Sequence, residues 1–392
     1  MKILFVIDTY YTNNNGTSIS AQRFASELRK RGHEVRILTA DESGEADVNL
    51  FSLRHFRMPI FQPIMNKHNF NFAKFWGEES LQTIHAAVEW ADIIHGFLPF
   101  PLEAVAQRYA EKINKPSTAA EHLQPESMTA NIRLHKFPWV TSLFYKAFRK
   151  ILFDRVQHVH CPSQFMADEV KKHGFKAKMH VISNGIQPVF IEAGRRNIEE
   201  RRPETFDEYK GKILIMMVGR LTREKQQALI MKAVPYSKYA DHIQLIFAGR
   251  GPMQSHYEKM GEKLPLKPEF VYVKRDELIT LLSQADLYVH AADMESEAIS
   301  CIEAVATGLV PIIANSPLSA TPQFALDERS LFKAGDPQDL ARAIDYWLDN
   351  TAECRRMEAE YAKSAEKYCI DYSITKFENM LNEAIEDHNR KP

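Results

Sequence analysis

ESEAISCIEAVATGLVPIIA, residues 295–314, is the stretch that decides the fold. Helix formers run from about Ala298 to Ala306, and Gly308 stands where a helix commonly ends. The apolar, β-branched residues 309–314 that follow predict a buried strand. This segment therefore predicts a helix followed by a core strand.

Two carboxylates in this segment, Glu295 and Glu303, are separated by seven residues. If the helix begins near Ala298, Glu295 lies in the loop before it and Glu303 about a turn and a half inside. The N–H groups at the helix start would attract an anion between the two carboxylates. A ligand with hydroxyls at both ends and phosphate in the middle is a nucleotide sugar.

The same alternation of strands and helices extends over the chain. A strand at Lys2–Ile7, a helix at about 18–31 and a strand at 34–39 form a βαβ unit. A length of 392 residues is enough for about two domains. Together with the alternation of strands and helices, it predicts an α/β fold of two doubly wound, Rossmann-like domains facing across a cleft. The expected domains are residues 1–195 and 211–370, joined by the charged segment 192–210, with a final helix at about 373–392 that packs back on the first domain.

A basic loop, GRLTREK, follows the first strand of the second domain and carries Arg220 and Lys225. A guanidinium can hold two phosphate oxygens, and an ammonium adds a point charge. Basic surface loops are common, so this loop alone decides little. In the same domain as Glu295, Glu303 and the helix start, it predicts a pyrophosphate site.

Two residues of the first domain are further candidates. Gly16 lies in the loop after the first strand and fits either an ordinary turn or a backbone close to a ligand. His122 follows the strand at 117–121, at the edge where open α/β sheets bind ligands. A structural role for this histidine is equally consistent with the sequence.

Residues 131–155, NIRLHKFPWVTSLFYKAFRKILFDR, combine basic and aromatic side chains. Apolar residues at 144, 148, 151 and 152 have helical spacing, which is typical of a core helix. The alternative is an amphipathic helix on an anionic membrane surface. The candidate contacts with that surface are Lys136, Trp139, Lys146, Arg149 and Lys150.

The composition excludes several classes of protein. With 50 basic and 51 acidic residues, the balanced charge gives no indication of a nucleic-acid partner. The four cysteines show no metal or redox spacing, which is typical of reduced thiols in a cytoplasmic protein. The apolar N-terminal run is too short for a signal peptide, and no apolar run is long enough to span a membrane.

Several motifs together resemble the retaining GT-B glycosyltransferases, in their largest family of sucrose synthases, mannosyltransferases and bacterial glycolipid synthases. The matching segments are VGRLTREK (218–225), IFAGRGP (246–252), ADLYVHAADMESEAISCIEAVATGLVPIIA, CPSQFMADEV and VISNGI. Two positions depart from the family pattern. Ala298 stands where the family usually has glycine, and Arg250 where it often has an acid.

The resemblance implies a role for each matching residue. Glu303 would bind the donor ribose, Glu295 the hydroxyls of the donor sugar, and His122 would lie beside the transferred sugar. The phosphates would be held by backbone N–H groups of Ile299 and Ser300 and by Arg220 and Lys225, with Gly16 approaching the donor. No aspartate-rich metal motif is present, so no obligatory metal is expected.

The stretches TAAEHLQPESMT (118–129) and IDTYYTNNNG (7–16) are similar to bacterial 1,2-diacylglycerol 3-α-glucosyltransferases. The expected function is transfer of a hexose, glucose in the first place, from a UDP-sugar to a membrane lipid such as diacylglycerol. The enzyme would be cytoplasmic and peripheral on the inner face of the cell membrane. The alternatives are a soluble or polysaccharide acceptor, or a catalytically silent module that binds sugar nucleotides.

Overall fold

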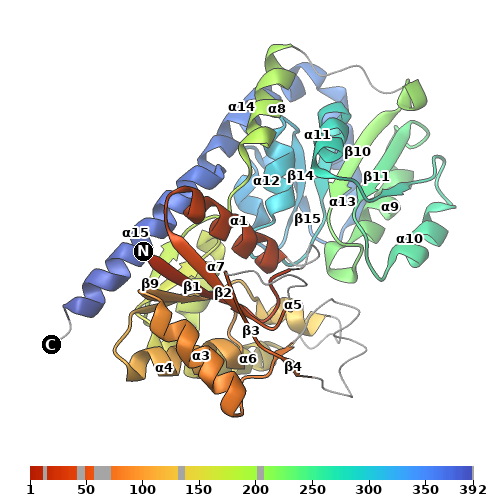
Figure 1. Ribbon diagram of the computed structural model, residues 1–392. Coiled ribbons are helices and arrows are strands. Elements are labelled where there is room, and N and C mark those ends of the chain that lie inside the picture. Colours follow the sequence, from red (N-terminus) through yellow and green to blue (C-terminus); the bar gives the residue numbers. More distant parts are fainter. Residues whose placement is uncertain (12–15, 42–48, 57–71, 131–136, 201–206, 391–392) are drawn as a thin grey trace. The chain divides into compact units, whose positions relative to one another are not determined.

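The computed structural model describes residues 1–11, 16–41, 49–56, 72–130, 137–200 and 207–390 (Figure 1). Its contacts divide the chain into two compact units. Unit 1 comprises Met1–Ser183 and Asp371–Pro392, and unit 2 comprises Asn184–Ile370. The division after Ser183 comes earlier than the expected boundary at residue 195, because the next helix belongs to unit 2.

Unit 1 is built on a seven-stranded parallel sheet of order β3-β2-β1-β6-β7-β8-β9. The strands are β1 (Lys2–Val6), β2 (Glu34–Thr39), β3 (Leu50–Ser52), β6 (Ile93–Gly96), β7 (Ser117–Ala120), β8 (His158–Cys161) and β9 (Lys178–Val181). A two-stranded antiparallel ladder joins β4 (His55–Phe56) to β5 (Phe72–Ala73). The central strands are buried on both faces, as a parallel sheet between two helical layers requires.

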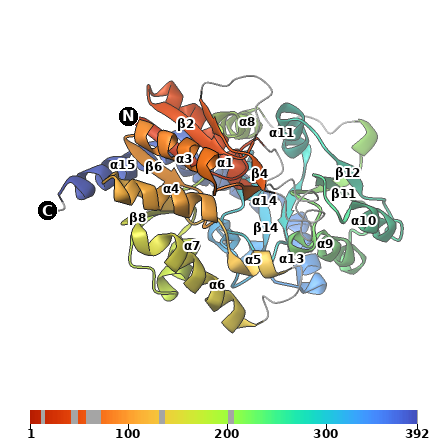
Figure 2. The ribbon, with the colours of Figure 1, turned by 60° about the horizontal axis from the view of Figure 1, so that its bottom comes forward.

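Helices cover both faces of this sheet (Figure 2). One layer packs into the two apolar clusters of unit 1 and comprises α3 (Glu78–Trp90), α4 (Pro101–Lys112), α6 (Pro138–Ile151) and α7 (Gln164–Lys172). The other face carries α1 (Gly16–Lys30) and α15 (Ile370–Asn389), and the short α5 (Pro125–Ala130) follows β7.

The last helix, α15, packs on unit 1. Its Phe377 is fully buried, with ring centroids 6.0 Å from Phe5 and 5.1 Å from Phe24. The guanidinium of Arg31 lies 2.7 Å from a carboxylate oxygen of Glu378. The end of the chain thus completes the first unit rather than the second.

Unit 2 has a six-stranded parallel sheet of order β12-β11-β10-β13-β14-β15. The strands are β10 (Ile213–Val218), β11 (Ile243–Ala248), β12 (Glu269–Val271), β13 (Leu287–His290), β14 (Pro311–Asn315) and β15 (Leu331–Lys333). The helices α8 (Pro188–Glu199), α11 (Arg275–Gln284), α12 (Ile299–Ala306) and α14 (Thr351–Ala365) pack together (Figure 1). A second group comprises α9 (Gln227–Ala233), α10 (Gln254–Gly261) and α13 (Pro337–Asp349).

The expected linker at 192–210 is wrong in its first part, because residues up to Glu199 belong to helix α8. Phe190 and Ile191 are buried ahead of the charged run, and Ala193 and Gly194 continue the buried face. A Cβ atom at Gly194 would lie 1.9 Å from the carbonyl oxygen of Ala306 on α12. After Phe190 and Ile191, the buried face of α8 continues with small residues, which a search for large apolar side chains does not detect.

The strand order of unit 2 reverses between β10 and β13, which are neighbours in the sheet. The chain proceeds from β10 outward to β11 and β12, then returns to β13 on the other side of β10. Open α/β sheets bind ligands at such a switch point, outside the carboxyl ends of the strands. The loops that follow β10 and β13 therefore define where to look for a site.

Candidate functional site

Two glycine-bearing loops pack against each other at the carboxyl edge of the unit 2 sheet. The N–H of Gly219 donates to the carbonyl of Ala248 at 2.9 Å, and the N–H of Leu221 to that of Arg250 at 3.1 Å. A Cβ at Gly249 would stand 2.0 Å from the carbonyl oxygen of Gly219, and backbone contact this close needs glycine. The segments GRL and AGRGP thus form one rigid rim.

Lys225 and Glu295 form an ion pair at the switch point. Lys225 ends a short 3-10 turn after β10, and Glu295 lies in the loop after β13. Their side chains are only 18% and 11% exposed. The ring Nε2 of His290, which is fully buried, lies 3.1 Å from the same Glu295 oxygen that contacts Lys225. Lys225, from the loop after β10, and His290, at the end of β13, therefore both contact the carboxylate of Glu295.

The electrostatics of this pair keep Glu295 ionised. Burial alone would raise the pKa of the Glu295 carboxyl, but the ammonium of Lys225 and the ring of His290 lower it to about 2. A carboxylate held charged and ordered can accept hydrogen bonds from ligand hydroxyls.

Arg220 is placed differently from Lys225. Its side chain is 45% exposed, and its guanidinium lies 3.5 Å from a carboxylate oxygen of Glu224. The carbonyl of Arg220 accepts a hydrogen bond from the Gln227 side chain at 2.8 Å, which fixes the loop backbone. The exposed guanidinium remains accessible to an anion.

Helix α12 begins after a left-handed residue. Ala298 has φ 74° and ψ 69°, and the first N–H donated back to its carbonyl is that of Cys301, at 3.0 Å. The N–H groups of Ile299 and Ser300 precede the first helical hydrogen bond, as at every helix N-terminus. Glu303 lies on the same helix, with 7% of its surface exposed. The order of carboxylate, helix start and second carboxylate that the sequence predicts is present.

The left-handed conformation of Ala298 explains why glycine is the usual residue here. A Cβ in this region costs about 1–2 kcal/mol, partly offset by the greater freedom of glycine in the unfolded chain. Ala298→Gly is therefore expected to raise the free energy of unfolding by about 0.5–1 kcal/mol, measured by urea denaturation. A decrease of that size would contradict the conformation described.

Two contacts of this site were not foreseen. His290 is one, and the second joins Glu297 to the turn at Asn184, whose N–H and side-chain amide donate to the Glu297 carboxylate at 3.0 and 2.6 Å. A third acidic residue, Glu297, was visible between Glu295 and Ala298 in the sequence. Its partner Asn184 is too distant in the sequence for the contact to be predicted.

In unit 1, His122 is buried after β7. It is 9% exposed, its ring is stacked on Phe97 with centroids 5.9 Å apart, and its Nε2 has no hydrogen-bond partner among the described residues. Burial, together with the nearby His160, lowers the pKa of His122 well below its usual value, so the ring is neutral. A neutral ring with an unused nitrogen fits a role toward a ligand as well as a structural one.

Gly16 is the first residue of α1 in unit 1. A Cβ there would meet nothing within 4 Å, so packing within the described protein does not require glycine.

Asp8, directly after β1, is a buried acid that the sequence analysis did not single out. Burial raises the pKa of its carboxyl to about 7, and the carboxylate accepts a hydrogen bond from the Ala73 N–H at 2.8 Å.

Helix α6, in the basic, aromatic segment, has both a buried side, as expected of a core helix, and an exposed side that a membrane-surface helix would need. Tyr145 and Phe148 are buried, as a core helix requires. A stripe on the opposite side exposes Trp139 (69%) and Leu143 (59%), and then Lys146 and Lys150. We call these four residues the α6 stripe.

Two of the expected surface residues are considered separately from this stripe. Lys136 lies outside the described residues. The guanidinium of Arg149 is 3.3 Å from both an Asp154 oxygen and the carbonyl of Gly174, so it supports the fold. None of the described helices is both long and apolar enough to cross a membrane.

Comparison with known proteins follows the same division of the chain. Residues 14–190 match the model described as Glycosyltransferase Family 4, and residues 198–365 the model described as Glycosyl transferases group 1. The chain is a group 1 glycosyltransferase with the GT-B fold. It is 24% identical over 327 residues to an alpha-monoglucosyldiacylglycerol synthase of Streptococcus pneumoniae, covering 80% of this chain and 71% of that protein.

Other relatives of this glycosyltransferase differ in their named donors. A GDP-mannose-dependent alpha-mannosyltransferase of Corynebacterium glutamicum is 24% identical, with 80% of this chain and 72% of that protein covered. The Anabaena protein HepE, solved in complex with UDP, has a TM-score of 0.75 at 14% identity, with 98% and 100% covered. The catalytic domain of a cholesterol-alpha-glucosyltransferase from Helicobacter pylori is 52% identical, with 40% of this chain and 98% of that domain covered and a TM-score of 0.39.

Proposed function

We propose that this glycosyltransferase is a retaining hexosyltransferase that transfers glucose, or a related hexose, from a UDP-sugar to a membrane lipid such as diacylglycerol. The observation that carries the donor half is the largely buried Lys225–Glu295 pair beside the start of α12, at the switch point of unit 2. Cation, helix N-terminus and ordered carboxylate are the three groups that a sugar diphosphate requires.

Each donor-site residue has a proposed task. Glu303 accepts hydrogen bonds from the ribose, and Glu295 from the hydroxyls of the hexose. The N–H groups of Ile299 and Ser300 bind the diphosphate, with Lys225 beside them. The exposed Arg220 adds a second cation that can grip two phosphate oxygens.

The chemistry follows from where charge develops. Breaking the bond between the anomeric carbon and the phosphate oxygen leaves positive charge on the sugar and negative charge on the diphosphate. Preorganised cations and N–H groups stabilise the diphosphate more in the transition state than in the ground state, which accelerates the reaction. In a retaining reaction the acceptor hydroxyl oxygen bonds to the face that the diphosphate leaves, and the hydroxyl proton passes to an oxygen of the departing diphosphate. No step of this account requires a metal ion.

His122 and Gly16 keep the roles that the family resemblance implies. His122 would lie beside the transferred sugar, and its neutral ring with an unused Nε2 supports that assignment. The open space at Gly16 supports a backbone that a ligand can approach.

The lipid acceptor is supported by two observations. The pneumococcal relative is named for a diacylglycerol glycolipid. The α6 stripe sets an exposed tryptophan and leucine in line with two exposed lysines, which suits the interface of an anionic bilayer. We therefore propose a cytoplasmic enzyme, peripheral on the inner face of the cell membrane. A soluble or polysaccharide acceptor is the second candidate for the same donor chemistry.

The stripe gives a direct prediction for membrane binding. Each lysine near an anionic surface contributes about 1 kcal/mol, so Lys146→Gln with Lys150→Gln should weaken binding to phosphatidylserine vesicles roughly 30-fold. The control removes the same charge elsewhere in unit 1, by Lys112→Gln with Lys171→Gln, and vesicle co-sedimentation measures both. Equal binding by the two double variants would return α6 to a purely structural role.

The proposed reaction is tested by a matrix of donors against acceptors. UDP-glucose, UDP-galactose and GDP-mannose are each offered with diacylglycerol vesicles, sterol vesicles or soluble oligosaccharides, and products are identified by mass spectrometry. Hexosyl lipid formed from a UDP-sugar supports the proposal, and its anomeric configuration tests retention. Transfer to soluble acceptors alone would favour the second candidate.

A further inference from the structure

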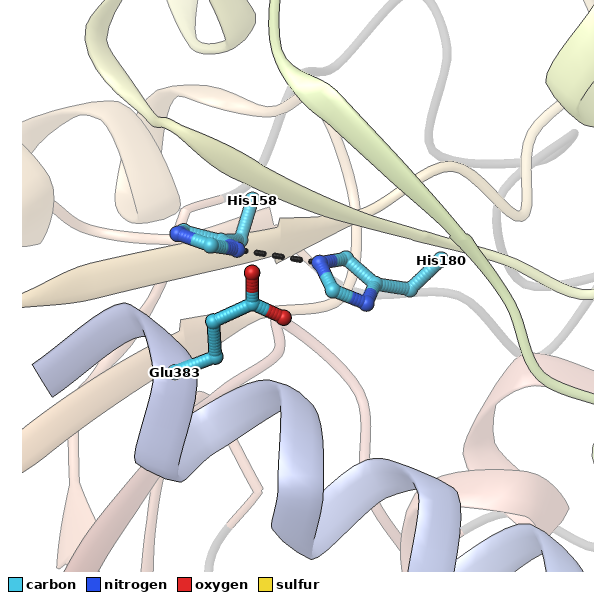
Figure 3. Close-up of side chains that lie close together, drawn as sticks. All are labelled: His158, His180 and Glu383. Carbon is cyan, nitrogen blue, oxygen red and sulfur yellow. Dashed lines mark hydrogen bonds between the residues drawn. The ribbon is translucent and has the colours of Figure 1, made fainter. Parts of the chain in front are cut away.

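Two histidines and a glutamate meet where α15 packs against the sheet of unit 1 (Figure 3). His158 comes from β8, His180 from the edge strand β9, and Glu383 from α15. One nitrogen of each ring and one carboxylate oxygen lie within 4.8 Å of one another. Three elements that are distant in the sequence thus direct ligand atoms at one point.

The rings of His158 and His180 are hydrogen-bonded to each other. His158 Nδ1 lies 2.9 Å from His180 Nε2, so a single hydrogen joins them. His158 is 2% exposed, and its other nitrogen, Nε2, is 3.2 Å from a carboxylate oxygen of Asp387, one turn after Glu383 on α15. The buried ring of His158 therefore lies between a second imidazole, to which it is hydrogen-bonded, and a carboxylate.

We propose that His158 Nδ1, His180 Nε2 and a carboxylate oxygen of Glu383 bind one Zn²⁺ ion, with water as the fourth ligand. Zinc takes imidazole nitrogen and carboxylate oxygen in tetrahedral geometry, which sets ligand nitrogens about 3.3 Å apart for bonds of 2.0–2.1 Å. The 2.9 Å separation has to widen by only a few tenths of an ångström. His158 Nε2 has no hydrogen-bond partner among the described residues, and the Asp387 carboxylate lies 3.2 Å from it, so a small turn of the ring would give the carboxylate contact that ligating histidines commonly have.

The surroundings also leave room for a metal ion to enter. Glu383 and Asp387 are 35% and 38% exposed, which leaves a route from solvent. The competitor is Lys178, which is 57% exposed and contacts one oxygen of Glu383. An ion pair this exposed contributes little and is readily displaced.

The role of such an ion would be structural. It would join two strands of unit 1 to the helix that ends the chain, and none of the proposed donor-site residues takes part. The sequence shows no local motif for this metal site, because its three ligands are separated by 22 and 203 residues. The site also stands whether or not the proposed reaction is correct.

The test uses the full chain without a histidine tag, freed of metal by chelator. Zn²⁺ is titrated by calorimetry, and Co²⁺ by its visible absorption, which reports tetrahedral geometry. One ion per chain is expected, with a rise in melting temperature on adding Zn²⁺, because a ligand of the folded state stabilises it. His180→Ala and Glu383→Gln should each weaken Zn²⁺ binding at least 10-fold and abolish the rise.

Two matched variants separate this site from general metal binding. His242→Ala and Glu386→Gln remove an exposed histidine of unit 2 and a neighbouring acid on α15, and both should bind as the wild type does. Lys178→Gln should bind Zn²⁺ at least as tightly, because a competitor for Glu383 is gone. Absence of stoichiometric binding, or binding unaffected by both His180→Ala and Glu383→Gln, would overturn the proposal.

Discussion

Lys225→Ala is expected to lower kcat by about 10²–10³-fold, the usual effect of removing one preorganised group that stabilises a developing negative charge. Lys225 is only 18% exposed and is fixed by Glu295, so water does not replace it equally well. Glu303→Ala is expected to abolish measurable transfer through loss of donor binding. Release of UDP and formation of the hexosyl product are measured together.

The control for Lys225 is Arg223→Ala, which removes an exposed cation from the same 3-10 turn. Its turnover should stay within a few-fold of the wild type. Removing Lys225 also leaves the largely buried Glu295 carboxylate without its ammonium partner, which lowers the stability of the fold. Rates are therefore compared at a temperature at which melting curves show every variant to be folded. Near-normal turnover in folded Lys225→Ala would exclude the donor-site assignment.

Gly194→Ala is expected to lower the free energy of unfolding by about 2–3 kcal/mol or more, as overpacking of a tight contact does. The new methyl group would lie 1.9 Å from the carbonyl oxygen of Ala306, so α8 has to move away from α12. Because α12 carries Glu303, donor affinity should fall as well. Urea denaturation followed by circular dichroism measures the first effect, and nucleotide titration the second.

Gly16→Ala provides the matched control for stability, since its methyl group would meet nothing within 4 Å. Its unfolding free energy should change by less than about 0.5 kcal/mol, the range of ordinary surface substitutions. If Gly194→Ala were as stable as the wild type, the close packing of α8 on α12 would be wrong.

The architecture could be predicted because its signals are local. The helix predicted to start near Ala298 begins at Ile299. Gly308, predicted to stand where the helix stops, follows its end and has the left-handed φ of 88°. The alternation of apolar strands with helices identified two parallel sheets, since buried strands have a composition that periodicity detects.

What the sequence did not reveal depended on contacts that form only in the folded protein. The linker was misplaced because α8 binds through Ala193 and Gly194, whose small size is the reason they fit. The contacts of Arg149 with Asp154 and Gly174 could not be read from the sequence, because they arise only in the folded unit, and its role at a membrane surface stays a prediction. Glu297 was missed because its partner Asn184 is distant in the sequence, and His290 because its contact with Glu295 depends on how the loop after β13 folds back.

The most direct test of the donor site is a crystal structure of the protein with UDP-glucose. The account predicts the diphosphate at the start of α12, within hydrogen-bond distance of the Ile299 and Ser300 N–H groups and of Lys225, with the ribose on Glu303 and the hexose on Glu295. A nucleotide sugar bound elsewhere, with Glu303 making no contact to the ribose, would contradict it.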